Sequence, residues 1–203
     1  TGTGDTAFVA GADIRELADL TPTAGTALSV QGNQKVFDYI EHYNKPVIAA
    51  VNGYALGGGL ELAMACHLRV FANTAKVGMP ETSLGLIPGY GGTQRLPQLV
   101  GRGRAMELFL TGDMIDAQRA YEIGLANMIC PPAALKSKVQ DLAAAIVKNA
   151  PQAQQQLLAA VCAGFDLQTD GYAAESEAFG ACFGTDNFVH GTKAFLYKRK
   201  PKF

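Results

Sequence analysis

Residues 45–63, KPVIAAVNGYALGGGLELA, combine a strand pattern with the start of a helix. The apolar run at 46–51 is rich in β-branched residues and ends at an Asn-Gly turn, which is typical of a strand covered on both faces. The glycines at 57–59 open a predicted helix over 60–67, where apolar residues recur at helical spacing. With a further strand expected at 68–72, the segment predicts βαβ alternation around a parallel sheet.

The segments on either side extend this pattern. Toward the N-terminus, a short strand, a turn and a helix are expected at 7–10, 11–13 and 26–43. Toward the C-terminus, residues 80–92 form a Gly- and Pro-rich loop, and a loop of that length in a compact domain usually has a function. The later elements are expected as helices at 104–110, 117–123 and 132–148, a strand at 125–129, and helices from Pro151 onward. The change to an all-helical pattern near 132 indicates a C-terminal subdomain.

The composition limits the classes of protein that fit. A chain of 203 residues with 48% hydrophobic and 17% charged residues is globular and has a core. Its net charge of -1 offers no broad field for nucleic acid or an anionic membrane, and no apolar run is long enough to span a bilayer. The cysteines form no CxxC pair, so we expect thiols and neither a zinc site nor a disulfide framework; they stand at 66, 130, 162 and 182.

Several common catalytic and nucleotide-binding motifs are incomplete or absent. Glycine pairs at 57–59, 89–91 and 101–103 lack the third glycine of a dinucleotide fingerprint. There is no Gly-Lys-Ser/Thr, GxSxG or HExxH motif. His67 is interpreted as a residue at the end of a helix, not as a catalyst. These absences weigh against NAD enzymes, P-loop NTPases, serine hydrolases and zinc proteases.

Two glycine-containing loops remain as candidates for a site. One, at 10–13, follows a predicted strand, and the other, at 57–59, precedes a helix whose N-terminus presents free N–H groups and a positive dipole end. Glycine allows a ligand close to the backbone, so the loops could direct two N–H donors at one oxygen. The alternative is that both are merely tight turns.

Two glutamates accompany these loops. Glu61 lies in the first turn of the glycine-led helix, and Glu81 lies at the start of the Gly- and Pro-rich loop, both among apolar neighbours. Burial would raise the pKa of either carboxyl toward a value useful for proton transfer. The alternatives are a charge that suits the helix dipole for Glu61 and a solvated loop residue for Glu81.

The stretches at 7–14, 45–63, 80–81 and 84–96 resemble, in order, the signature of the crotonase or enoyl-CoA hydratase/isomerase family. The likeness continues to 195–200 and covers essentially the whole chain. It implies an α/β fold: a crotonase-like ββα superhelix core at 1–131, with the N-terminal part apparently missing because the chain lacks an initiating Met and the family's first strands and helix. A helical trimerisation subdomain would follow at 132–203.

The resemblance also implies residue roles. The backbone N–H groups of Ala12 and Gly58 would form an oxyanion hole for the thioester oxygen, and Glu61 and Glu81 would be the catalytic carboxylates. The substrate-binding residues would be Ala10, Ala12, Asp13, Ile14, Arg15, Gly57 and Gly58. No metal or redox cofactor is expected. Coenzyme A would enter as part of the substrate and is not counted as a cofactor. His67 stands where many members have aspartate.

The implied activity is that of a hydro-lyase of fatty-acid β-oxidation, which hydrates a trans-2-enoyl-CoA to a 3-hydroxyacyl-CoA. The alternatives are an enoyl-CoA isomerase that uses Glu81 alone, another acyl-CoA lyase of the family, and a non-catalytic RNA-binding member. A homotrimer or a hexamer of paired trimers is expected, in the cytoplasm or, in a eukaryote, the mitochondrial matrix. A basic cluster near the end is either a solvated tail or a contact for CoA phosphates; it comprises Lys193, Lys198, Arg199, Lys200 and Lys202.

Overall fold

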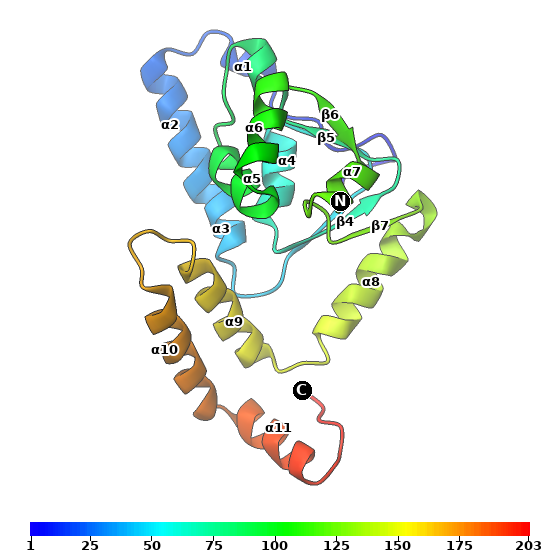
Figure 1. Ribbon diagram of the computed structural model, residues 1–203, viewed down its shortest axis with the longest axis vertical. Coiled ribbons are helices and arrows are strands. Elements are labelled where there is room, and N and C mark those ends of the chain that lie inside the picture. The colour runs from blue at the N-terminus through cyan, green and yellow to red at the C-terminus, as the bar shows by residue number, and fades with distance from the viewer. The chain divides into compact units, whose positions relative to one another are not determined.

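The computed structural model describes residues 1–203 and divides the chain into two compact units (Figure 1). The first unit comprises Thr1–Glu41 and Val47–Val139, and the second comprises His42–Pro46 and Gln140–Phe203. The boundary therefore falls after Val139, within a helix, whereas the change of sequence pattern suggested a boundary at 132. The predicted α/β class with mainly parallel strands is confirmed.

The first unit contains two small sheets. One has the order β1-β3-β5-β6, in which only the β5–β6 pair is antiparallel; its strands are β1 (Ala7–Val9), β3 (Tyr54–Leu56), β5 (Lys76–Gly78) and β6 (Met114–Asp116). The other is wholly parallel in the order β2-β4-β7, with strands β2 (Ile48–Val51), β4 (Leu68–Ala72) and β7 (Met128–Cys130). The apolar run at 46–51 thus supplies a parallel strand, as predicted, but β2 lies at the edge of its sheet beside β4. Its residues alternate between partly buried and buried, so the expectation of a central strand covered on both faces is wrong.

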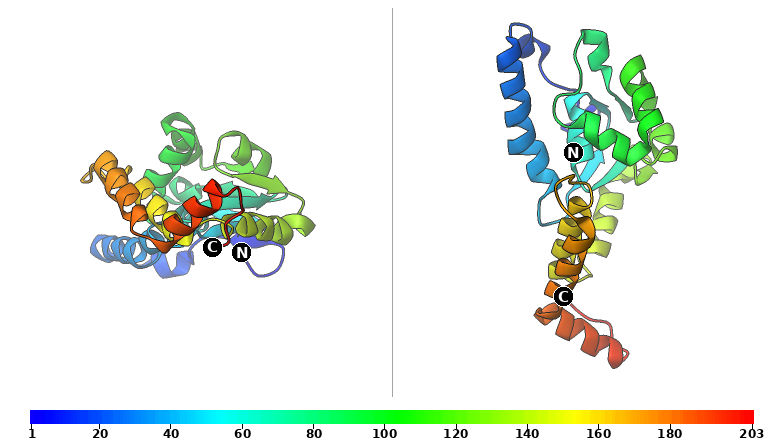
Figure 2. Two further views of the ribbon diagram at one scale, coloured as in Figure 1. Left: turned by 90° about the horizontal axis from the view of Figure 1, so that it is seen from below. Right: turned by 60° about the vertical axis from the view of Figure 1, so that its left-hand side comes forward.

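The helical segments of the first unit are interspersed with its strands along the chain. They are α1 (Ile14–Leu17), α2 (Pro22–Gly32), η1 (Asn33–Phe37), α3 (Asp38–Glu41), α4 (Gly58–Ala65), η2 (Pro80–Leu84), α5 (Gly92–Val100), α6 (Arg102–Thr111), α7 (Ala117–Glu122) and η3 (Pro132–Ala134). Helix α8 (Leu135–Ile146) spans the boundary between the units. The second unit continues with α9 (Pro151–Ala163), α10 (Gly171–Phe183) and α11 (Asp186–Leu196), and α9 and α10 pack side by side (Figures 1 and 2).

The helix expected at 26–43 begins earlier and contains an irregular turn. Thr21 starts it, because its side chain accepts the backbone N–H of Ala24, and Pro22 fits the first helical position. The π-helical segment η1 lies between α2 and α3. The sequence reading also missed β3, β5 and β6, each of which has only 3 residues. Strands this short carry little alternation, and unlike the equally short β1 and β7 they do not lie within a longer apolar stretch.

Helix α4 lies at the centre of the first unit, between η1 and α3 on one side and α5 on the other (Figure 2). Leu60 of α4 belongs to the same core cluster as Phe71, Met79 and Leu96, which are among the largest wholly buried side chains. Gly59 allows α4 to approach β1, because a Cβ there would lie 1.8 Å from the Val9 carbonyl oxygen. This close approach fixes the N-terminus of α4 against the sheet.

The second unit has a different character, because none of its residues is buried. Its aromatic side chains meet mainly one another, as in the edge-on pair of Phe179 and Phe183, whose ring centroids lie 5.1 Å apart. None of the chain's helices is both long and apolar enough to cross a membrane.

Candidate active site

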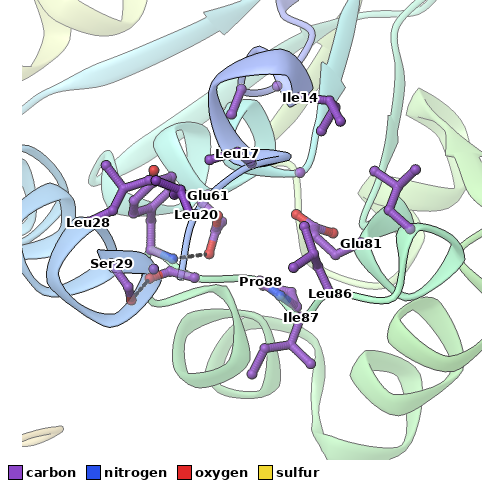
Figure 3. Close-up of a pocket in the computed structure, with 18 of the residues that line it drawn as sticks. Ile14, Leu17, Leu20, Leu28, Ser29, Glu61, Glu81, Leu86, Ile87 and Pro88 are labelled. Carbon is purple, nitrogen blue, oxygen red and sulfur yellow. Dashed lines mark hydrogen bonds between the residues drawn. The ribbon is translucent and has the colours of Figure 1, made fainter. Parts of the chain in front are cut away.

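The first unit contains a cavity of about 900 Å³ with mostly apolar walls (Figure 3). The loop after β1, helices α1 and α2, the β3–α4 junction, η2 and residues 84–93 all contribute to it. The predicted residues that line it are Ala10, Ala12, Ile14, Gly57, Gly58, Glu61 and Glu81. The two loops and two glutamates chosen from the sequence therefore share one cavity.

The β3–α4 junction gives its two glycines different functions. Gly57 has a φ of 51°, which favours glycine, and its N–H donates to the Gly78 carbonyl at 3.0 Å. Gly58 is the first residue of α4, so its N–H has no acceptor within the helix, and none elsewhere in the chain. The N–H of Ala12 likewise has no acceptor in the chain. Gly58 and Ala12 are thus free donors, as are Gly11, Asp13 and Gly59 of the same loops.

Glu61 is a buried carboxylate held by backbone donors. It is 1% exposed, and its Oε1 accepts the N–H groups of Tyr90 and Gly92, each at 2.8 Å. Burial raises the pKa of Glu61, while the two hydrogen bonds and the charge of Arg95 act against that rise. Its Oε2 takes no part in these bonds and lies 3.9 Å from the place a Cβ on Gly58 would occupy.

Glu81 is less constrained than Glu61. Its Oε2 is buried and has no hydrogen-bond partner. Burial raises the pKa of Glu81, and the negative charge of Glu61 raises it further, although its own backbone N–H lowers it. An unpartnered buried carboxyl oxygen favours the protonated form of the group.

The two carboxyl groups flank the Gly57–Gly58 peptide. Glu81 Oε1 lies 2.6 Å from the position of a Cβ on Gly57, whereas Glu61 Oε2 lies near Gly58. Figure 3 shows both carboxyl groups turned toward the same space. A carboxylate held by two N–H donors, opposite a carboxyl group that favours its proton, is suited to paired proton transfer at a molecule bound over Gly58.

Two predicted binding residues, Asp13 and Arg15, do not line the cavity. Asp13 caps α1 by accepting the Arg15 N–H, and its carboxylate pairs with the Arg15 guanidinium at 2.6 Å. This partner lowers the pKa of Asp13. Both side chains lie in solvent beside the cavity, because the turn that places Ala12 and Ile14 inward directs them outward.

Three residues of the site were not assigned a function from the sequence. Tyr90 and Gly92 hold Glu61 through their N–H groups, and Arg95 donates to the Tyr90 carbonyl at 2.7 Å. The ring of Tyr90 also lines the cavity and stacks on Phe37, with centroids 4.9 Å apart. The only signal in the sequence was the Gly-Tyr-Gly-Gly run, because backbone donors leave no signature in residue type.

The side chains that could serve as metal ligands or nucleophiles elsewhere in the chain do not contribute to the cavity. No group of three or more His, Cys, Asp or Glu side chains is arranged to hold a metal ion. His67 follows the end of α4 and lies outside the cavity lining, where its Nδ1 accepts the Val47 N–H at 2.9 Å. Cys66 and Cys130 are buried thiols.

The fold and the site together define a class of protein: an α/β enzyme that brings two carboxyl groups to the N-terminus of one helix. A model of the family described as enoyl-CoA hydratase/isomerase matches residues 1–203. The chain therefore belongs to the enoyl-CoA hydratase/isomerase family.

Individual relatives agree with this assignment. A crotonyl-CoA hydratase of Syntrophomonas wolfei subsp. wolfei is 47% identical over 204 residues, which covers 100% of this chain and 78% of the relative. A short-chain-enoyl-CoA hydratase of Clostridium acetobutylicum is 46% identical and covers 98% of this chain and 77% of the relative. The crystal structure of an enoyl-CoA hydratase from Bacillus anthracis superposes with a TM-score of 0.91 at 40% identity, over 100% of this chain and 79% of that one.

Proposed function

We propose that this chain is an enoyl-CoA hydratase, which adds water across the 2,3 double bond of a trans-2-enoyl-CoA to give a 3-hydroxyacyl-CoA. The observation that carries the proposal is that the carboxyl groups of Glu61 and Glu81 lie in one cavity, close to Gly58 and Gly57 respectively. The names of two relatives, at 47% and 46% identity, support the substrate class.

The thioester carbonyl would accept the N–H groups of Gly58 and Ala12. Both donors lack an acceptor in the chain, and Gly58 adds the positive dipole end of α4. Together they would stabilise the negative charge that develops on the oxygen as water attacks C3. The polarised carbonyl also makes C3 electrophilic, so this one contact both binds and activates the substrate.

The surroundings of the two glutamates support different roles for them. Glu61 accepts two N–H bonds, which favour its ionised form, so it would take the proton from the attacking water. Glu81 has an unpartnered buried oxygen and the charge of Glu61 nearby, both of which favour the protonated form, so it would deliver a proton to C2. One proton is taken and one is given, and the addition needs no redox or metal cofactor beyond the coenzyme A carried by the substrate.

The binding of the CoA part and the assembly of the chain belong to the same proposal. Ala10, Ile14 and Gly57 would contact the thioester end from within the cavity. Asp13 and Arg15, at its margin, would lie along the path of the CoA. We further propose a homotrimer or a dimer of trimers, because the second unit exposes many aromatic and aliphatic side chains. The proposed location is the cytoplasm, or the mitochondrial matrix in a eukaryote.

The test is the hydration of crotonyl-CoA, followed by loss of the ultraviolet absorbance of the conjugated enoyl thioester. We expect turnover without added metal or redox cofactor, and a 3-hydroxybutyryl-CoA product by mass spectrometry. Supplying 3-enoyl-CoA in a parallel reaction distinguishes the isomerase alternative. A chain that isomerises 3-enoyl-CoA but leaves crotonyl-CoA unhydrated would contradict the proposal.

A further inference from the structure

Arg95 is a buried arginine at the centre of a charged cluster behind the cavity. It lies on α5 and is 5% exposed. Its Nη2 donates to Asp38 Oδ1 at 2.8 Å and to Glu41 Oε2 at 2.7 Å, and its Nε donates to Glu41 Oε2 at 3.0 Å. These bonds tie α5 to α3 across α4, which packs against both helices. The guanidinium therefore has one fixed orientation.

The same guanidinium also holds the loop that binds Glu61. Arg95 Nη1 donates to the Tyr90 carbonyl at 2.7 Å, while the N–H of Tyr90 donates to Glu61 Oε1 at 2.8 Å. The next residue, Gly91, has a φ of 88°, and a Cβ there would lie 2.1 Å from Arg95 Nη1. The chain thus wraps closely around the guanidinium, so Arg95 and Glu61 hold opposite polar groups of one residue.

Charge provides a second connection between Arg95 and Glu61. Among the elements packed against α4, Lys35 of η1, Tyr39 of α3 and Tyr54 of β3 are exposed to solvent. The titratable groups that lie near Glu61 or its partners are Glu81 of η2, Tyr90, Arg95 of α5, and Asp38 and Glu41 of α3. Of these, Arg95 alone is positive, and its charge acts, with the two backbone hydrogen bonds, against the burial that raises the pKa of Glu61. Asp38 and Glu41 partly neutralise that positive charge.

We propose that Arg95 is a positioning residue for the reaction, which fixes the Tyr90–Gly92 loop against Glu61 and keeps Glu61 in the form that accepts a proton. The inference rests on the proposed hydratase function and assigns Arg95 no contact with substrate. Arg95 does not line the cavity. Its effect on the reaction passes through Glu61 and the Tyr90 peptide.

The test is the pH dependence of kcat/KM for crotonyl-CoA in variants of the cluster. Arg95→Gln removes the positive charge and leaves Asp38 and Glu41 uncompensated. The acidic limb, where kcat/KM falls at low pH as Glu61 is protonated, should therefore shift to higher pH by about one unit. Loss of the fixed loop should also lower kcat about tenfold, with little change in KM. Arg95→Lys keeps the charge but not the planar fork. The acidic limb of its pH profile should therefore lie at the parental pH, whereas kcat should be only partly restored.

Asp38→Asn provides a variant with the opposite expected sign. The amide oxygen still accepts from Arg95, but one neutralising charge is gone, so the acidic limb should move downward by about half a pH unit. Asp38 is half-buried, so Asp38→Asn should disturb the fold less than a change at buried Arg95. It therefore tests the charge argument even if Arg95→Gln does not fold.

Arg69 provides a matched control. It is also 5% exposed and lies in the first unit, but it donates to the carbonyls of Leu125 and Cys66, away from the cavity. Arg69→Gln should lower thermal stability and leave the acidic limb in place. If the parent hydrates crotonyl-CoA and neither Arg95→Gln nor Asp38→Asn moves the limb, or if Arg69→Gln moves it equally, this inference alone is overturned. A parent without hydratase activity overturns the proposed function itself.

Discussion

The two units of this chain use apolar residues in opposite ways. In the first unit, residues such as Phe71, Leu60 and Val51 are wholly buried, and they fix the helix whose N-terminus faces the cavity. In the second unit no residue is buried, and Phe195 is 81% exposed. The contrast teaches that the first unit holds its cavity by its own packing, whereas the second leaves its large apolar side chains exposed, as the proposed assembly requires.

The chemistry follows the same division. Every residue that lines the cavity belongs to the first unit. Substitutions there should change turnover and leave assembly intact, whereas substitutions on the exposed helices of the second unit should change assembly first. The predictions below test this separation.

Replacing either glutamate should have the largest effect. Glu61→Gln and Glu81→Gln each remove a group proposed to move a proton, so kcat should fall at least about 100-fold with little change in KM. Steady-state kinetics with crotonyl-CoA measures this. Light scattering should show the parental mass in both variants, and parental turnover in either one would remove that glutamate from the mechanism.

Removing the N–H of Gly58 should cost about as much in turnover. Gly58→Pro deletes the proposed donor, with an expected loss of about 3 kcal/mol of transition-state stabilisation, or roughly 100-fold in kcat. Proline is tolerated at the first position of a helix, so the fold is expected to survive. Circular dichroism and solution mass verify this.

The matched control for Gly58→Pro is Gly58→Ala, which keeps the N–H. A Cβ there would meet the Tyr90 ring at 3.6 Å, an ordinary contact, so the fold should tolerate it and kcat should fall less than in Gly58→Pro. Gly57→Ala would be a poor control, because its Cβ would lie 2.6 Å from Glu81 Oε1 in a backbone conformation that suits glycine. A folded Gly58→Pro variant with undiminished kcat would mean that the oxygen is held elsewhere.

The solution mass tests the second unit. The parent should have a mass that is a multiple of three chains, and Phe195→Asp should reduce it, because a charge cannot be buried without a partner in an apolar interface. The matched control is Leu110→Asp on α6 of the first unit, at a side chain that is 70% exposed. If Leu110→Asp dissociates the assembly and Phe195→Asp does not, the comparison of the two units is wrong.

The smallest expected effect is on stability. The pKa of Glu81 is raised in the folded chain, so its ionisation opposes folding. This cost is absent below the ordinary pKa of 4.5, grows as pH rises above it, and is complete above the folded-state pKa. Glu81→Gln should therefore raise Tm by about 2 °C near pH 8 and leave it unchanged near pH 4.

Glu61→Gln sharpens this prediction. The Glu61 carboxylate accepts two N–H groups, and an amide oxygen accepts them more weakly, so the gain in Tm should be smaller than for Glu81→Gln. Differential scanning calorimetry across this pH range measures both. A gain for Glu81→Gln that does not depend on pH would show that the ionised carboxyl group is not its cause.

Much of the fold could be predicted from the sequence, because its signals are local. The run at 46–51 became β2, and the three glycines after Leu56 became the start of α4. The strands β3, β5 and β6 were missed because each has only 3 residues and is bounded closely by glycine or charged residues, whereas the equally short β1 and β7 lie within longer apolar stretches. The irregular helix from Pro22 to Glu41 was found as a helix but not as three segments, because the π-helical turn packs against α4, which lies elsewhere in the sequence.

The sequence by itself determined which residue types are present for the chemistry: two glutamates in apolar company, and a glycine-led helix start that leaves a donor free. Only the tertiary structure decided that Glu61 is held by Tyr90 and Gly92 while Glu81 Oε2 has no partner. It also decided that Asp13 and Arg15 face solvent, and that Arg95 links α3 to the loop around Glu61. The physical reason is that periodicity and turn chemistry act between neighbours in the chain. Burial, backbone donors and charge act between residues that meet only after folding.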